Sequence, residues 1–311
     1  MMDYTYSIII PHRNCPKLLE RCINSIPDRN DLQIIVVDDN STDVESLKRL
    51  EKTFNNKNVT FVYTKEGKGA GYARNEGLKI AKGKWLVFSD SDDYFLQEAF
   101  HFFDDYAEGK EDIVVFKHTG VDSETLEPLE RSELRNIIIE EYLANRSLEN
   151  ENKLRYNNDV PWAKMIRQKV VSDNDIVFDE VPASNDIMFS TLCGYYAKKI
   201  TADNRVPYVA VTRYGSISKT KSKERYLSSF IVNLRKNAFL KQIGHPENQG
   251  IMMTRWVQCL LNFGPVEAIK YIILSRQYNV SPFYGINSYF SISKIVKMAK
   301  VYFTKDKYMK K

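Results

Sequence analysis

The sequence has few residues of the kinds that build metal clusters or disulfide frameworks. Its four cysteines form no CxxC pair and its four histidines are scattered over 311 residues, which excludes zinc-site spacing and a disulfide scaffold. The cysteines are expected to be reduced, partly buried thiols. No stretch reaches the ~18 uncharged apolar residues of a membrane-spanning helix. The first residues, MMDYTYSIIIP, show no secretory leader, so we expect a cytoplasmic protein.

Glycine-rich phosphate loops are also missing. The nearest match, GKGAGYARN at 67–75, does not fit GxGxxG, and no P-loop GKS or GKT occurs. An EF-hand fails as well: Asp90 and Asp92 suit its first and third positions, but Tyr94 and Phe95 stand where a ligand and a glycine belong. A nicotinamide-type fingerprint, a P-loop and an EF-hand are therefore excluded.

Apolar residues make up 43% of the chain and aromatic residues 12%, enough to bury the core of one large domain or two smaller ones. The net charge is +5, but residues 294–311 hold seven lysines against Asp306 alone, which gives +6 and leaves about −1 for the rest. This distribution argues against a nucleic-acid-binding body and indicates a basic tail.

The first 120 residues alternate apolar runs with helical patterns, which predicts an α/β fold with a mostly parallel sheet and helices on both faces. Strands are expected at 7–11, 34–39, 59–63, 85–90 and 112–116, and helices near 16–26, 43–54, 70–81 and 96–107.

The rest of the chain is more mixed and then mostly helical. Helical patterns occur near 132–145, 161–171 and 186–198, a strand is expected at 207–213, and helices predominate from about 223. We predict that the chain divides into 1–120, 121–222 and a helical C-terminal extension (223–311).

Polar clusters follow three of the expected strands: His12-Arg13-Asn14, Asp38-Asp39-Asn40 and Asp90-Ser91-Asp92-Asp93. In parallel sheets, ligands bind beyond the carboxyl ends of the strands. The third cluster places three carboxylates within four residues, and their repulsion is tolerable when a cation lies among them. Mg²⁺ and Mn²⁺ take oxygen ligands and usually share them with substrate phosphates.

These motifs together resemble the inverting glycosyltransferases of family 2, which have the GT-A fold, a Rossmann-like nucleotide-diphospho-sugar transferase fold. The resemblance covers about 1–220 and is carried by SIIIPHRN (7–14), IIVVDDNSTD (34–43), GYARNEGLKIAKGKWLVFSDSDD (71–93), PWAKMIRQ (161–168), SNDIMFS (184–190) and RYGSIS (213–218).

The resemblance implies that 1–120 is the nucleotide-sugar-binding half and 121–222 the acceptor-binding half. It implies a nucleotide-sugar site that comprises Pro11, Arg13, Asp39, Arg74, Asp90, Ser91, Asp93 and Arg213. Asp39 would accept hydrogen bonds from the base or ribose. Asp90 and Asp92 match the Asp-x-Asp motif, with Asp92 as the direct ligand of Mn²⁺ or Mg²⁺ and Asp90 nearer the sugar or sharing the metal. The family usually has an aromatic or hydroxyl residue where Arg13 stands, which leaves the nucleotide open.

The resemblance also implies a catalytic base and an acceptor pocket. Asp186 would take the proton of the acceptor hydroxyl, with Asn185 in place of the family's usual glutamate; the alternative is that Asp186 only caps a helix. Trp162 and Lys164 would line the acceptor or sugar pocket with Asn185, although Trp162 could equally be a core anchor. Arg213 would reach the diphosphate or form a surface ion pair.

The predicted function is metal-dependent, inverting transfer of a sugar from a nucleotide-diphosphate donor, with a UDP-sugar favoured, to a saccharide or lipid-linked acceptor in bacterial surface-polysaccharide synthesis (capsule, O-antigen or exopolysaccharide). Two rivals stay open. A sugar nucleotidyltransferase should carry a glycine-rich loop after the first strand, where PHRNC has no glycine. A non-catalytic module that binds sugar nucleotides would be expected to have lost acidic positions.

The basic tail at 289–311 suggests a contact with an anionic membrane surface and hence a peripheral location on the inner face of the cytoplasmic membrane. On a helical wheel an apolar arc lies opposite Lys294, Lys297 and Lys300, and its members are Ile292, Ile295, Val296, Ala299, Tyr302 and Phe303. The alternative is that this arc packs on the protein's own body.

Overall fold

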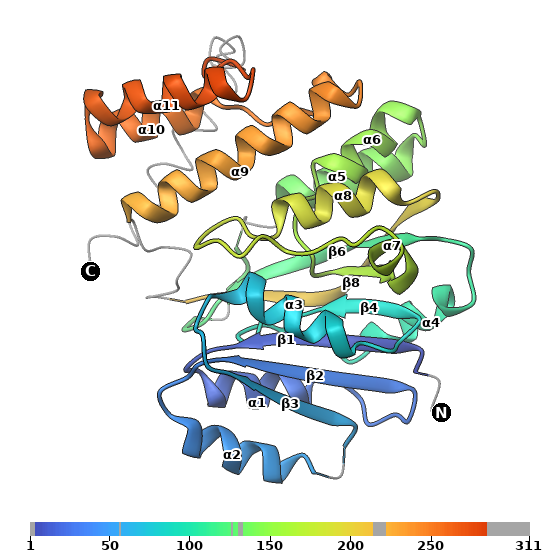
Figure 1. Ribbon diagram of the computed structural model, residues 1–311. Coiled ribbons are helices and arrows are strands. Elements are labelled where there is room, and N and C mark those ends of the chain that lie inside the picture. Colours follow the sequence, from blue (N-terminus) through green and yellow to red (C-terminus); the bar gives the residue numbers. More distant parts are fainter. Residues whose placement is uncertain (1–3, 56, 126, 130–132, 214–221, 285–311) are drawn as a thin grey trace. The chain divides into compact units, whose positions relative to one another are not determined.

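The chain forms two compact units, Met1–Arg213 (the N-terminal unit) and Tyr214–Lys311 (the C-terminal unit). The computed structural model (Figure 1) describes residues 4–55, 57–125, 127–129, 133–213 and 222–284. The expected tail helix and the serines after Arg213 lie outside the described residues. The division into 1–120, 121–222 and 223–311 stays a prediction.

One eight-stranded sheet, in the order β3-β2-β1-β4-β7-β6-β8-β5, forms the centre of the N-terminal unit. Its strands are β1 (Tyr6–His12), β2 (Leu32–Asp39), β3 (Val59–Thr64), β4 (Trp85–Phe88), β5 (Tyr94–Phe95), β6 (Ile113–Asp122), β7 (Lys164–Arg167) and β8 (Ile200–Thr212). Strands β3, β2, β1 and β4 are parallel neighbours, as are β6 and β8. Strands β7 and β5 run antiparallel to their neighbours. The predicted α/β fold is confirmed.

Helices cover both faces of this sheet (Figure 1). They are α1 (Pro16–Asn24), α2 (Val44–Thr53), α3 (Ala70–Ile80), α4 (Ala99–Ala107), α5 (Glu133–Ala144), α6 (Leu148–Tyr156), α7 (Gln168–Ser172) and α8 (Ile187–Tyr196). Ile8 of β1 belongs to the core under α1, α2 and α4, whereas its neighbour Ile9 belongs to the core under α3 and α5–α8. Alternate side chains point to opposite faces, so strands buried on both sides read as continuous apolar runs.

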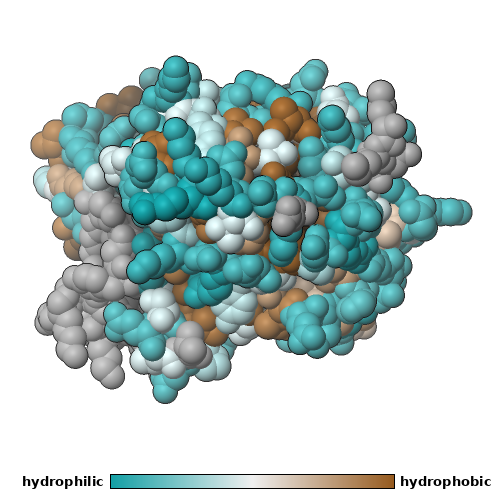
Figure 2. Space-filling model, turned by 90° about the horizontal axis from the view of Figure 1, so that it is seen from below, coloured by the Kyte–Doolittle hydropathy of each residue, from teal (hydrophilic) through white to brown (hydrophobic). Residues whose placement is uncertain are grey.

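The surface on the side of α2 is mostly hydrophilic, with small hydrophobic areas between the polar side chains (Figure 2).

Close packing of α3 on the opposite face depends on Gly77, because a Cβ there would lie 2.6 Å from Cγ2 of Ile9. This approach brings the first turns of α3 close to the strand ends.

The helix predicted at 161–171 is wrong. Residues 164–167 form β7, which lies between β4 and β6, and only 168–172 are helical. Met165 packs in one core and Ile166 in the other, so the apolar run reflects a strand buried on both faces. Three further parts of the fold were not anticipated: the two-residue strand β5, helix α6, whose sequence is mostly polar, and the first half of β8, which starts at Ile200.

The C-terminal unit is helical, as predicted. It contains α9 (Lys223–Gln242), a short 3₁₀ helix (Pro246–Asn248), α10 (Met253–Phe263) and α11 (Pro265–Gln277). Its core is separate from those of the sheet and includes Phe230, Leu234, Cys259 and Tyr271. Within the described part of the chain, no helix is both long and apolar enough to cross a bilayer.

Candidate active site

The sequence-predicted site residues meet at one edge of the sheet. Strands β1, β2 and β4 are parallel, so their polar ends (from His12, Asp39 and Ser89) emerge at the same edge. Strand β7 is antiparallel to β4 and therefore starts there, at Lys164. Strand β8 runs parallel to β6, which pairs antiparallel with β7, so its end at Thr212 reaches the same edge.

Asp39 presents a buried acceptor at the end of β2. Its side chain is 4% exposed. Oδ2 accepts the N–H of Gly69 at 2.9 Å and lies 3.5 Å from Nη1 of Arg13, whereas Oδ1 has no hydrogen-bond partner among the described residues. Burial raises the pKa of Asp39. A buried, unsatisfied carboxylate oxygen is costly, so this atom suits the N–H or O–H of a bound molecule.

The neighbouring Asp38 is fully engaged, and sequence reasoning gave it no role. It accepts hydrogen bonds from His12 Nδ1 (2.8 Å), from the hydroxyl of Ser41 (2.5 Å) and from the backbone N–H of Ser41 (2.9 Å). Burial alone would raise the pKa of Asp38, but these bonds outweigh it and lower the pKa. The backbone N–H of Cys15 donates to His12 Nε2, so this network fixes the loop between β1 and α1, which carries Arg13. Pro11 lies within β1 and is buried.

Two of the carboxylates after β4, Asp90 and Asp92, are half-buried, and the third, Asp93, is buried. Asp90 accepts a hydrogen bond from Nη2 of Arg74 at 2.5 Å, and Asp92 accepts one from Nε of Arg213 at 3.2 Å. Burial and the charge of Asp90 raise the pKa of Asp92. The hydroxyl of Ser91 lies 3.3 Å from Sγ of Cys15. Arg213 is therefore held inside the site by Asp92.

Asp93 connects this loop to strand β8. Its Oδ2 accepts the hydroxyl of Tyr208 and its Oδ1 accepts the N–H of Val211, both at 2.7 Å. Burial and the charges of Asp90 and Asp92 raise the pKa of Asp93 well above its usual value. With both oxygens engaged by protein donors, Asp93 is placed to orient the loop.

The carboxylate oxygens of Asp90 and Asp92 suit a divalent cation whose other ligands are substrate phosphates. The arginines occupy Oδ1 of Asp90 and Oδ2 of Asp92, which leaves the second oxygen of each carboxylate for a metal. No group of three or more His, Cys, Asp or Glu residues that could hold a metal occurs in the described residues. Mg²⁺ commonly binds through one or two carboxylates plus phosphates, so a two-carboxylate set suits this role.

Arg74 links the strand-end carboxylates to the segment before α8. It is 5% exposed, and its Nη1 donates to Oδ1 of Asn185 at 2.9 Å while Nη2 binds Asp90. Its guanidinium also lies over the ring of Phe178, 5.3 Å from the centroid. The buried guanidinium of Arg74 thus connects Asp90, which the sequence assigned to the nucleotide-sugar site, with Asn185, the neighbour of the predicted base Asp186.

Two more residues on the same face of α3 hold this segment, and sequence reasoning missed both. The side chain of Asn75 accepts from the N–H of Phe178 at 2.8 Å and donates to its carbonyl at 3.0 Å. Gly71 packs so closely that a Cβ would overlap the carbonyl oxygen of Asp179. The spacing 71, 74, 75 is the i, i+3, i+4 pattern of one helix face, but nothing in the sequence shows what that face contacts.

Asp186 precedes α8 without capping it. It occupies the N-cap position, but its side chain makes no capping hydrogen bond. Burial, followed by the charge of Asp159, raises the pKa of Asp186 to about 6, while Arg74 opposes the shift. A carboxylate with a pKa near neutrality and no capping bond is suited to accept a proton.

The side chains of Trp162 and Lys164 are both buried. Trp162 is 7% exposed and stacks on Tyr208, with ring centroids 5.4 Å apart. Nζ of Lys164 donates to the carbonyl of Asn158 at 2.5 Å, and burial lowers the pKa of Lys164 to about 8. Trp162 belongs to the core under α1, α2 and α4. A role for Trp162 or Lys164 in the acceptor or sugar pocket stays a prediction.

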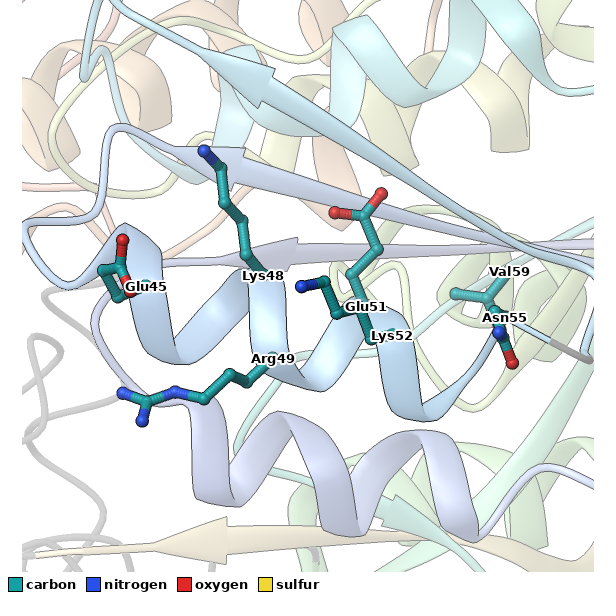
Figure 3. Close-up of a pocket in the computed structure, with 7 residues that line it drawn as sticks. All are labelled: Glu45, Lys48, Arg49, Glu51, Lys52, Asn55 and Val59. Atoms are coloured by element: carbon teal, nitrogen blue, oxygen red, sulfur yellow. The ribbon is translucent and has the colours of Figure 1, made fainter.

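The hollow shown in Figure 3 lies elsewhere. Charged side chains of α2 line it with Val59, the first residue of β3. Because β3 is parallel to β2, its first residue belongs to the edge opposite the polar strand ends. None of the site residues named above lines this hollow, so we assign it no role in the chemistry.

Comparison with known proteins agrees with this geometry. TarS of Staphylococcus aureus, a poly(ribitol-phosphate) beta-N-acetylglucosaminyltransferase, is 29% identical over 222 residues, which cover 68% of this chain and 36% of TarS. An uncharacterized glycosyltransferase of Mycoplasma genitalium, MG060, is 32% identical over 122 residues, which cover 36% of this chain and 40% of MG060. The chain thus spans well under half the length of these relatives.

Solved structures show the same fold. The crystal structure of S. aureus TarS 1–349 with UDP-GlcNAc has a TM-score of 0.66 at 22% identity and covers 88% of this chain and 80% of that one. The mannosyltransferase PcManGT of Pyrobaculum calidifontis, in complex with GDP-Man and Mn²⁺, has a TM-score of 0.53 at 15% identity, covering 96% and 79%. The pattern of glycosyl transferase family 2 matches residues 7–174, more than half of the chain, so the chain belongs to glycosyl transferase family 2.

Proposed function

We propose that this chain is a metal-dependent, inverting glycosyltransferase that moves a sugar from a nucleotide diphosphate to an acceptor hydroxyl. The observation that carries the proposal is the Arg74 bridge. It joins Asp90, in the strand-end Asp-x-Asp, to Asn185, the neighbour of Asp186. The groups suited to a diphosphate and the group suited to a proton therefore lie at one edge of one sheet.

In the proposed reaction the acceptor oxygen attacks the anomeric carbon from the face opposite the leaving group. The new C–O bond forms as the bond to the diphosphate breaks, and Asp186 takes the acceptor proton. Attack from the opposite face inverts the configuration at that carbon. A raised pKa favours this role, since an effective base has a pKa close to the operating pH.

Positive charge at the site would stabilise the departing nucleotide diphosphate. Arg213 and Arg74 already contact the carboxylates around it, and Asp92 and Asp90 would hold Mn²⁺ or Mg²⁺. The cation would supply electrostatic stabilisation to the developing charge on the leaving group. The free Oδ1 of Asp39 would accept from the base or ribose.

A UDP-sugar is the proposed donor, supported by the TarS structures with UDP-GlcNAc and with UDP. The proposed acceptor is a bacterial surface polymer or its lipid-linked precursor, because relatives are named for poly(ribitol-phosphate) and for a diphosphoundecaprenol acceptor. We propose that the reaction takes place in the cytoplasm, with contact of residues 289–311 to the inner membrane face as a further part of the proposal.

Calorimetric titration with UDP and Mn²⁺ tests the metal and the donor together. UDP is expected to bind at least tenfold more weakly after chelation and to Asp92→Asn, because the phosphates lose their shared cation. Asp28→Asn is the matched control, since Asp28 is exposed and lies between α1 and the start of β2, at the sheet edge opposite the polar strand ends. Unchanged affinity under both treatments would remove the metal from the proposal.

A further inference from the structure

Three side chains of α11 form an exposed apolar stripe, which we call the α11 ridge: Val266, Ile269 and Ile273. They are 66%, 57% and 52% exposed. At about 100° per residue they fall within an arc of roughly 60°. The buried residues of α11, Ala268, Tyr271 and Ser275, lie on the opposite side of the helix. The ridge thus points away from the core of the C-terminal unit.

Basic side chains flank the ridge on both sides. On the same wheel, Lys270 lies roughly 40° beyond Val266 and Arg276 roughly 20° before Ile269. Lys270 also contacts Glu267 at 2.7 Å, with Lys223 at 2.8 Å from the same carboxylate. Two cations share one acidic group there, so the local balance stays positive. Long basic side chains beside an apolar stripe can keep their charges in water while their stems cover apolar surface.

The two units carry opposite charge. Met1–Arg213 has 28 Lys and Arg against 36 Asp and Glu, a net of −8, whereas Tyr214–Lys311 has 17 against 4, a net of +13. Residues 222–284 alone have 8 against 3, a net of +5. The described part of the C-terminal unit therefore carries net positive charge even without the basic tail. Such a surface complements an extended anionic partner.

We propose that the α11 ridge and its flanking cations form a contact surface for an anionic lipid bilayer. Apolar side chains at this spacing can enter the headgroup region, and each nearby lysine or arginine adds about 1 kcal/mol of attraction to anionic lipid. The apolar stripe disfavours a nucleic acid, whose affinity comes mainly from phosphate contacts. The surface belongs to the unit that holds none of the site residues and is independent of the proposed transfer reaction.

Vesicle co-sedimentation of the full chain tests this surface. Wild type is expected to bind phosphatidylglycerol-containing vesicles and not pure phosphatidylcholine vesicles. The double variant Ile269→Ser/Ile273→Ser is expected to lower the partition coefficient about tenfold, because it removes most of the inserted apolar area. The matched control is Leu134→Ser/Leu148→Ser, at positions 70% and 71% exposed in the acidic unit; its binding should stay within about twofold of wild type.

Three results would overturn the proposal: equal binding of wild type and the ridge variant, equal binding of wild type to both vesicle types, or a lipid-free wild-type dimer that the ridge variant converts to a monomer. The last result would make the ridge an interface between copies of this chain. UDP binding, measured on the same samples, reports on the transfer site alone and is expected to stay unchanged in every variant. A failure of the ridge proposal is thereby distinguished from a failure of the proposed transfer reaction.

Discussion

At the scale of single residues, the site combines groups that the protein satisfies with groups that it leaves available. Asp38 and Asp93 have every oxygen engaged by protein donors. Asp39 keeps a buried oxygen that no described residue contacts by a hydrogen bond, and Asp186 precedes a helix without capping it. All four residues are acidic and lie at or next to the end of a strand or helix. Their hydrogen bonds nevertheless distinguish the two that shape the site from the two that are available to a ligand.

Replacement of Asp186 tests the proton acceptor. Asp186→Asn is expected to lower kcat by ~10²–10⁴, the usual worth of a general base, while UDP affinity stays unchanged. In the wild type, kcat/KM should rise with pH through about 6 and then level off, because the base works only when ionised and its pKa is about 6. A transfer assay over this pH range measures both, and near wild-type turnover by Asp186→Asn would rule the residue out as base.

The raised pKa of Asp186 also affects the stability of the folded protein. The pKa of Asp186 is higher in the folded protein than the ~3.9 of an unfolded aspartate, so its ionisation lowers the free energy of unfolding as the pH rises from that value to about 6. At pH 7, Asp186→Asn is therefore expected to unfold at the same or a higher temperature than wild type. Lost activity in that variant could not then be attributed to unfolding.

At the scale of elements, helix α3 carries the connection between the two chemical groups. Gly71, Arg74 and Asn75 contact the segment 178–185 through close packing, a guanidinium and a paired amide. Asp179 N–H also donates to the carbonyl of Asn185, which closes the segment on itself just before Asp186. The position of the proposed base therefore depends on a helix far from it in sequence.

Asn75→Ala tests this dependence. The two hydrogen bonds to the backbone of Phe178 are lost, so we expect a decrease of about 1–3 kcal/mol in the free energy of unfolding. We also expect a fall in kcat at unchanged UDP affinity, since Asp186 loses its placement while the strand ends do not. Lys79→Ala, on the same helix with a side chain 66% exposed, is the control. A fall in UDP affinity equal to that in kcat would contradict the role of α3 in placing the base.

Sequence patterns predicted the elements whose environment is uniform. Strands β1, β2 and β4 were found because both of their faces are buried, and the polar residues after them could be assigned to one edge from the parallel arrangement alone. Strand β7 was mistaken for a helix, because a short run such as KMIR, buried on both faces, has no period to read. The contacts of Asn75 were missed because they join residues 103 positions apart, and the bond between His12 and Asp38 because it joins residues 26 positions apart.

At the scale of the whole molecule, the proposed chemistry and the proposed membrane contact fall in different units. Every site residue named above lies in Met1–Arg213, which has its own two cores, and the α11 ridge lies in Tyr214–Lys311, whose core contains only its own residues. The acidic unit would bind the nucleotide through local cations, whereas the basic unit would bind an anionic surface through its overall charge. Added salt should therefore weaken the membrane contact much more than UDP binding.

Separate cores also predict how a ligand changes thermal unfolding. In scanning calorimetry, UDP with Mn²⁺ at about 100 times its dissociation constant should stabilise the unit that binds it by roughly 2.7 kcal/mol. We expect two transitions, of which only that of Met1–Arg213 moves to higher temperature, because every residue proposed to bind the ligand lies in that unit. The variant Asp92→Asn should show both transitions without the shift. If wild type instead unfolds in one transition that moves as a whole, the units unfold cooperatively, and nucleotide binding at the sheet edge would also stabilise the helices that carry the ridge.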